Sequence, residues 1–296
     1  MMRLVLLSLL LSSSHPFVNG FISARNPQRR PTLKMGLEVL DTAPTIQAYA
    51  DAIAIVASKT GTGGAPGGEY DDAWLLRFVL AAKGDVDAAA AMVETTLAWR
   101  RGEGKSIVDA AAAGLAAARE GGGWNNDALF NAAPHSAAIA PFITPAGSQI
   151  LTLRGQNDAK YFVKVIRASA IDDKALMSTV SAEQLAEFFL FSYEANALVI
   201  EAATRESGKL FKGVTVNDLS GIDLFGDATF RNALSAASKQ ANAVGYGGYN
   251  DATILVNLPK LLGALVKLFK PLFPPAVQKK LKFEQGPLSD VSFSMN

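Results

Sequence analysis

The sequence contains no cysteine and only two histidines among its 296 residues. The absence of cysteine excludes disulfides, thiol nucleophiles and cysteine-based metal sites. His15 lies in the leader described below, so His135 is the one imidazole left in the rest of the chain, and no Gly-x-Ser-x-Gly elbow accompanies it. We therefore expect His135 to be structural, and we expect binding rather than enzymatic catalysis, with no cofactor and no metal.

Charged residues are also scarce, at 19% against 49% hydrophobic residues, so the chain is able to bury a large core. The net charge of +1 is unevenly distributed. The first 34 residues carry five basic residues and no acid, which leaves 23 basic residues (28 − 5) against 27 acidic ones, a net charge near −4. A mildly acidic body lacks the basic footprint of a nucleic-acid-binding protein.

The basic N-terminus has the pattern of a targeting leader. Residues 1–20 read as a signal peptide, with Arg3 before a short apolar run and small residues at Asn19-Gly20. That run is too short to span a bilayer. Residues 21–34 begin with Phe21 and resemble the transit part of the two-part presequence of algae with secondary plastids. We expect a plastid location; the alternative is an ordinary secretory signal with a basic propeptide, which leads to secretion or an endomembrane lumen.

The first half of the remaining chain has helical periodicity. Apolar residues recur at helical spacing over 41–60, and residues 61–68 (GTGGAPGG) form a flexible linker. An Ala- and Leu-rich helical block follows over 71–118, and three glycines at 121–123 break it. We assign 41–120 to an all-helical N-terminal subdomain.

The second half alternates strands and helices. Apolar runs predict strands at 149–153, 161–167, 213–219 and 252–257. Helices are predicted from Ser181, which forms a capping box with Gln184, to about 204, and over 227–243, 261–269 and 275–281. This order predicts an α/β domain over 130–285 with a mixed, partly parallel sheet, followed by a tail at 286–296.

Short motifs in these two halves resemble the Sec14-like (CRAL-TRIO) family in order and type. The helical half carries Asp71-Asp72-Ala73-Trp74-Leu75-Leu76-Arg77-Phe78, then Lys83, Asp85-Val86 and Trp99-Arg100. The second half carries Ala146-Gly147-Ser148, Val214 to Gly221, Tyr249-Asn250-Asp251, Asn257-Leu258-Pro259 and Lys270-Pro271. The resemblance covers residues 70–283.

The resemblance implies a sheet that floors an apolar cavity, a helix that gates it, and one lipid or other hydrophobic molecule held inside. In phosphoinositide-binding members, five side chains hold the headgroup. Two of the five positions are retained, at Lys83 and Lys280, and Asp251 conservatively replaces the Glu; these three residues are the headgroup candidates. Ala82 and Val277 replace a basic residue and a threonine. Phosphatidylinositol is therefore one candidate ligand among phospholipids, tocopherols and carotenoids.

The stretch between Asp251 and Glu284 contains six lysines, no acid and many leucines and phenylalanines. Apolar side chains with lysines between them suit the surface of an anionic bilayer, and four prolines prevent one continuous spanning helix. Two core-packed helices with solvated lysines are the alternative. By family position, we expect gate and membrane-contact roles for the following residues: Leu261, Leu262, Leu265, Phe269, Lys270, Leu272 and Phe273.

Taken together, the sequence predicts lipid binding and transfer between membranes, through transient contact with an anionic membrane surface. The alternative is a lipid-sensing adaptor that presents its ligand or recruits partners without net transfer. Two further features are assigned structural roles. Asp218, at a strand end, is expected to cap a turn, and the four carboxylates spaced along one predicted helix are expected to form its solvated face: Glu183, Glu187, Glu194 and Glu201.

Overall fold

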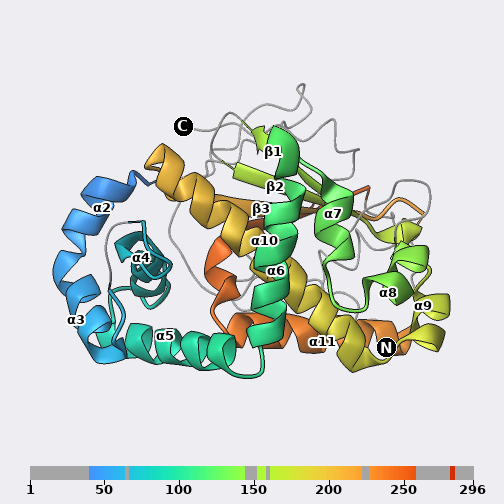
Figure 1. The fold of residues 1–296 in the computed structure, drawn as a ribbon, viewed down its shortest axis with the longest axis horizontal. Helices are drawn as coiled ribbons and strands as arrows, with labels where there is room; N and C mark the ends of the chain where they lie inside the picture. The colour runs from blue at the N-terminus through green and yellow to red at the C-terminus, as the bar shows by residue number, and fades with distance from the viewer. Residues whose placement is uncertain are drawn as a thin grey trace, which may run out of the picture.

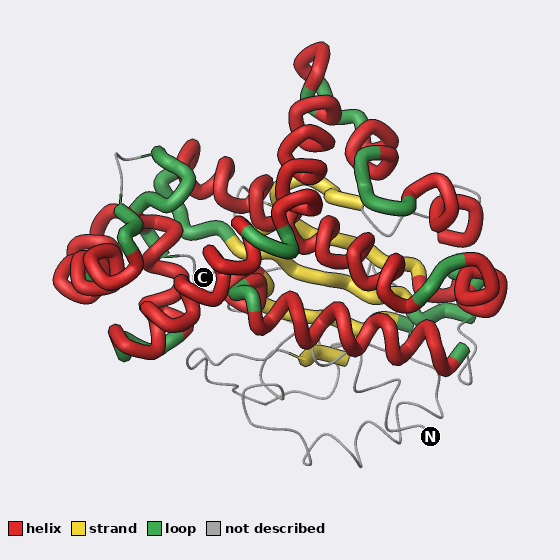
Figure 2. Tube along the Cα trace, turned by 60° about the horizontal axis from the view of Figure 1, so that its bottom comes forward, coloured by secondary structure: helices red, strands yellow, loops and turns green. Residues whose placement is uncertain are grey.

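The computed structural model describes residues 40–63, 67–143, 152–157, 161–221, 227–257 and 281–283. A sheet lies behind a layer of helices, and a second group of helices packs beside that layer (Figures 1 and 2). This arrangement of helices and a mixed sheet confirms the predicted α/β class. The leader (1–34) and the tail (286–296) lie outside the described residues.

Within the described residues, the N-terminal group contains four helices: α2 (Thr42–Ala48), α3 (Ala50–Thr60), α4 (Asp72–Ala81) and α5 (Val86–Arg101). Asp71 and Asp85 begin α4 and α5, because their carboxylates accept hydrogen bonds from the first free backbone N–H groups of each helix. Apolar faces of α3, α4 and α5 form a core of their own, to which Leu210 is added from after α10. The predicted helix 41–60 is confirmed, with an interruption at Tyr49.

The helical block predicted over 71–118 consists of α4, α5 and α6 (Lys105–Ala118). The turn between α5 and α6 contains Gly104, where a Cβ atom would overlap the ring of Trp99. Glycine is therefore required at this close approach. The predicted break at 121–123 is confirmed by the short 3₁₀ turn η2 (Glu120–Gly122).

Three short helices were not predicted from the sequence: α7 (Asn126–Asn131), α8 (Ser136–Ile143) and α9 (Asp173–Thr179). They are six to eight residues long, which is too short for helical periodicity to emerge. Asn125 and Asp172 cap α7 and α9. The apolar residues of these helices join the larger core, beside Phe188 and Phe191 of α10.

The longest of the described helices, α10 (Ala182–Ser207), crosses the molecule diagonally in Figure 1. The predicted capping box is confirmed, since Ser181 Oγ accepts from the N–H of Gln184 and Gln184 Oε1 accepts from the N–H of Ser181. The helix ends at Gly208 in the left-handed conformation. Beside it lies α11 (Ala228–Ala243), followed by the 3₁₀ turn η5 (Tyr246–Tyr249).

In the part of the chain that the structure describes, the sheet has five strands in chain order: β1 (Thr152–Asn157), β2 (Tyr161–Arg167), β3 (Lys212–Asp218), β4 (Asn250–Val256) and β5 (Leu281–Phe283). The pair β1–β2 is antiparallel and the pairs β2–β3, β3–β4 and β4–β5 are parallel. The prediction of a mixed, partly parallel sheet is confirmed. The crossover from β2 to β3 contains α10 and the crossover from β3 to β4 contains α11, since parallel strands need a long connection.

Two boundaries differ from the sequence prediction. The strand predicted over 149–153 overlaps β1 only at Thr152 and Leu153, and residues 149–151 lie outside the described part. The helix predicted over 275–281 is wrong at Leu281, which begins β5 and pairs with Thr253 of β4. No helix in the described ranges is both long and apolar enough to cross a membrane.

Candidate ligand-binding site

The two faces of the sheet differ in chemistry. Lys164 of β2 points toward α10, because its Nζ lies 5.4 Å from the ring centroid of Tyr193. Since side chains alternate along a strand, Val165 points to the opposite face. The register aligns Lys164 with Thr215 and Thr253, and aligns Val165 with Val216 and Ile254. The face toward α10 therefore carries the polar row Lys164, Thr215 and Thr253, with the apolar Ile166 and Leu255 two residues further along β2 and β4. The face away from α10 is aliphatic at the aligned positions.

The aliphatic face extends over the three central strands. Its side chains have exposed fractions between 0% and 6%: Val165, Val214, Val216, Ala252, Ile254 and Val256. None of these six belongs to either hydrophobic cluster formed by the described helices. Helices α10 and α11 both lie on the other side of the sheet (Figure 2). This face, which we call the aliphatic sheet face, is the candidate surface for a hydrophobic ligand.

An ion pair lies where β3 and β4 begin. Asp251 was predicted as a headgroup ligand, and its carboxylate lies 3.1 Å from Nζ of Lys212. Both side chains are about one quarter exposed or less, at 24% for Lys212 and 20% for Asp251. The carboxylate thus already has a cationic partner within the chain.

No described contact links the other predicted headgroup residues, Lys83 and Lys280, to the Asp251–Lys212 pair. Lys83 is exposed in the turn between α4 and α5, where its φ of 56° places it in the left-handed region. Lys280 and all seven predicted gate residues (Leu261, Leu262, Leu265, Phe269, Lys270, Leu272 and Phe273) lie outside the described residues.

Asp218, at the carboxyl end of β3, is hydrogen-bonded both to the turn that follows β3 and to Asn257, just after β4. Asp218 accepts from the backbone N–H of Ser220 at 2.9 Å and from Nδ2 of Asn257 at 2.8 Å. Burial works against the charged form of Asp218, but these hydrogen bonds outweigh it, and the pKa of the carboxyl is lowered. The predicted capping role of Asp218 is confirmed. Asn257, from the Asn-x-Pro motif, is one of its donors.

The solvated face predicted for the α10 carboxylates is wrong for two of them. Glu194 and Glu201 have exposed fractions of 0% and 5% and meet buried arginines from the N-terminal helices. Both oxygens of Glu194 accept from Nη1 of Arg100 at 2.7 Å, and Oε1 of Glu201 accepts from Nε of Arg77 at 2.6 Å. Isolated charges are too costly to bury, so such pairing is required.

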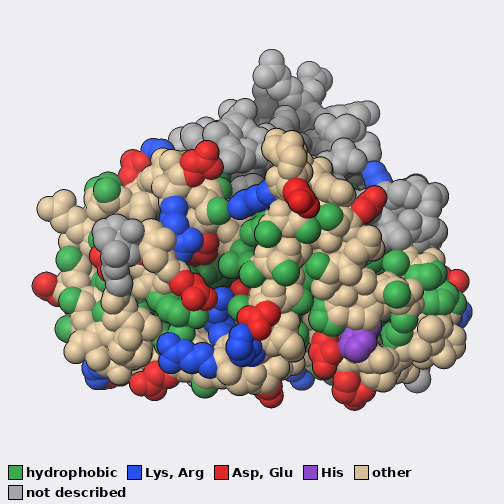
Figure 3. Space-filling view, in the orientation of Figure 1, with side chains coloured by type: hydrophobic (Ala, Val, Ile, Leu, Met, Phe, Trp, Pro, Cys, Tyr) green, Lys and Arg blue, Asp and Glu red, His purple; other side chains and the backbone are tan. Residues whose placement is uncertain are grey.

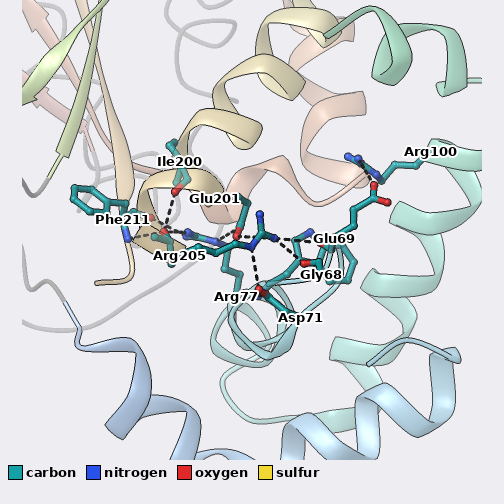
Figure 4. A network of polar contacts seen from close by, with 11 residues as sticks. Gly68, Glu69, Asp71, Arg77, Arg100, Ile200, Glu201, Arg205 and Phe211 are labelled. Atoms are coloured by element: carbon teal, nitrogen blue, oxygen red, sulfur yellow. Dashed lines mark hydrogen bonds and ion pairs between the residues drawn. The ribbon is translucent and has the colours of Figure 1, made fainter. Parts of the chain in front are cut away.

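The two Nη atoms of Arg77 donate further hydrogen bonds (Figure 4). Its Nη1 donates to the backbone oxygen of Phe211 at 2.8 Å, and its Nη2 donates to Oγ1 of Thr204 at 2.9 Å. The guanidinium also lies 4.7 Å from the ring centroid of Tyr249. Arg77 therefore connects α4, the end of α10, the segment that enters β3, and η5.

Arg205 of α10 extends the same network. Arg205 donates from Nε to Asp71 at 2.9 Å and from Nη2 to the backbone oxygen of Gly68 at 3.1 Å, as Figure 4 shows. Asp71 thereby caps α4 and pairs with α10 at once. In Figure 3 the surface is hollowed between the N-terminal helices and α10, with side chains of both charges around the hollow.

The buried network changes the pKa values of three of its side chains. Burial opposes the charged form of Arg100, but the Glu194 carboxylate outweighs it, and the pKa of Arg100 is raised. Tyr246 donates its hydroxyl to Glu194, and burial followed by that negative charge raises the tyrosine pKa. Burial and then Glu201 raise the pKa of Tyr249 well above its usual value. Both tyrosines therefore remain protonated donors at neutral pH.

A sequence signal for these pairs did exist. Arg77 stands inside the apolar run Leu75-Leu76-Arg77-Phe78, and Arg100 follows Trp99. An arginine within a buried helix face requires an acid, and α10 offers acids seven residues apart at 194 and 201. The sequence does not indicate which of the four carboxylates turn inward.

His135 lies at the beginning of α8, away from these pairs. Its Nε2 lies 2.7 Å from Glu187 of α10, and this pair is largely exposed. Within the described ranges, no group of three or more His, Asp or Glu side chains is placed to hold a metal ion. The histidine therefore connects α8 to α10, in keeping with the structural role expected for it.

Comparison with known proteins gives little similarity at the level of sequence. No family model matches the chain, and no curated protein matches it. Among solved structures, the crystal structure of Sfh5 is similar over 83% of this chain and 82% of that chain, with 14% sequence identity and a TM-score of 0.49. This likeness is weak and does not by itself place the chain in a family.

The buried ion pairs predict a large stability effect at Arg77. Replacing Arg77 with Met leaves the Glu201 carboxylate buried without its main partner, so the free energy of unfolding in urea should fall by about 3–5 kcal/mol. The exposed pair Lys59–Asp87, with Nζ and Oδ1 2.6 Å apart, provides the control. Lys59→Met should leave the unfolding curve unchanged. Equal stability of Arg77→Met and the wild type would contradict a structural role for the pair.

Proposed function

We propose that the protein binds one lipid or other hydrophobic molecule in an apolar cavity against the aliphatic sheet face. The observation that carries this proposal is the row of aliphatic side chains across β2, β3 and β4, at Val165, Val216 and Ile254. An acyl chain laid on such a surface gains about 0.8 kcal/mol for each CH₂ group removed from water. This gain supplies affinity without covalent chemistry, so the activity is binding and not catalysis.

The order of motifs in the sequence supports the same proposal, because the family they resemble holds hydrophobic ligands above its sheet. By that resemblance, the segment 261–281 gates the cavity and contacts the membrane. Its leucines and phenylalanines would enter the bilayer interface while its lysines remain near lipid phosphates. Transfer between membranes follows if the segment opens at the bilayer surface.

The identity of the headgroup is a separate question. The ion pair between Asp251 and Lys212 weighs against phosphatidylinositol, because a paired carboxylate has fewer lone pairs to offer to inositol hydroxyls. The replacements at Ala82 and Val277 point in the same direction. We propose a hydrophobic ligand whose recognition depends on its apolar part, and we propose that the leader directs the protein to a plastid.

A substitution that fills the cavity tests the binding site. Val216 is fully buried, and Val216→Phe places a ring where the ligand is proposed to lie. Binding of a fluorescent phospholipid analogue should fall at least tenfold, because the added ring would stand where the proposal places the ligand.

The matched control is Val93→Phe in α5, an equally buried valine inside the packed core of the N-terminal helices. Overpacking there should cost about 1–3 kcal/mol and leave lipid binding intact in the folded fraction. If Val216→Phe is as destabilised as Val93→Phe and still binds the analogue, the proposed site is wrong.

An adaptor that senses a lipid without transferring it is the alternative function. Transfer of a labelled lipid from donor to acceptor vesicles distinguishes the two. With anionic lipid in the vesicles, we expect transfer at protein amounts far below those of the lipid, since the proposed gate segment is basic. Tight binding with no exchange would favour the adaptor.

A further inference from the structure

Trp124 differs from the other two tryptophans of the chain. Trp74 and Trp99 are each 5% exposed and lie against aromatic rings of the two cores. Trp124 is 40% exposed, and in the described part of the chain its indole has neither a ring contact nor a hydrogen bond. Such an indole keeps a large apolar surface and an N–H donor available to a partner outside the chain.

Trp124 lies in the turn of a hairpin formed by α6 and α7, which projects at the top of the molecule in Figure 2. The base of the hairpin is closely packed, because a Cβ atom at Gly114 of α6 would lie 2.7 Å from that of Ala132, just after α7. The turn is closed where the N–H of Asn125 donates to the backbone oxygen of Ala118 at 2.7 Å. The packed base therefore holds Trp124 outside the core.

The residues around Trp124 add little apolar surface. Residues 121–123 are glycines, and a Cβ atom at any of the three would meet no atom within 4 Å. Arg119 and Glu120 precede the glycines and are exposed. The turn 119–124, which we call the hairpin tip, therefore presents one indole on a stretch of bare backbone, with charges of both signs behind it.

The hairpin tip fits a bilayer better than a protein partner. A stable protein interface buries about 800 Å² on each partner and surrounds its aromatic anchors with a packed rim. The tip offers one aromatic side chain beside glycines and charges. A bilayer interface requires no complementary shape, because an indole sits at headgroup level with its apolar ring toward the acyl chains and its N–H toward water and lipid oxygens.

We propose that the hairpin tip is a membrane-docking site, at which Trp124 inserts into the headgroup region of a phospholipid bilayer. Residues 116–127 contain one basic residue and two acids, so the attraction comes from the indole and not from charge. The tip differs in this respect from the proposed gate segment, whose lysines favour anionic lipid. It also makes no use of the aliphatic sheet face, so docking through Trp124 is independent of the proposed ligand.

Quenching of tryptophan fluorescence by brominated phosphatidylcholine in uncharged vesicles tests this docking with the full-length chain. Trp124 should be quenched, whereas Trp74 and Trp99 are buried and should remain shielded. Trp124→Ala should abolish the quenching. It should also weaken partition of the chain into phosphatidylcholine vesicles about tenfold, because the exposed part of one indole is no longer removed from water.

Ile55→Ala is the matched control, because Ile55 is 44% exposed but lies along α3. It should leave partition unchanged, and both variants should unfold at the wild-type urea midpoint. Trp124→Ala should still bind the fluorescent phospholipid analogue, so a failure of the ligand site would be observed separately. Trp124 that stays unquenched with vesicles in excess, or equal partition of Trp124→Ala and the wild type, would overturn the proposal and favour a protein partner for the indole.

Discussion

The buried ion pairs between α10 and the N-terminal helices are the constraint on which the rest of the fold depends. Arg77 and Arg100 come from α4 and α5, and their partners Glu201 and Glu194 lie two turns apart on α10. Removing these four charges from water is tolerable only if each meets its partner with good geometry. The pairs therefore allow few relative placements of the two helical groups. Arg77 extends this constraint to the segment entering β3 through its hydrogen bond to Phe211.

The position of α10 also distinguishes the two faces of the sheet. Tyr193 of α10 meets Lys164, so the polar row of the sheet, with Thr215 and Thr253, lies on the α10 side. The aliphatic row points away from α10. In most layered folds the apolar face of a sheet packs against the helices that cover it. The candidate surface for a hydrophobic ligand is therefore the face turned away from α10.

Rules that consider only neighbouring residues predicted two features that depend on neighbouring residues alone. The capping box at Ser181 and Gln184 and the apolar strand run at 213–219 depend on neighbouring residues, and the structure contains both. Features that depend on distant partners were missed. Glu194 turns inward because of Arg100, 94 positions earlier, and Leu281 forms a strand because β4 offers an edge. Of the predicted headgroup residues, Asp251 lies at the sheet but is paired with Lys212, a partner 39 positions away.

The most direct test of the account is native mass spectrometry of the protein purified from its source cells, followed by extraction of whatever is bound. We expect a complex with one hydrophobic molecule per chain, because the aliphatic sheet face is proposed to hold a single ligand. Release of that molecule into organic solvent should identify it as a lipid or a related apolar compound. The mass of the bare chain alone, from gentle purification without detergent, would contradict the account.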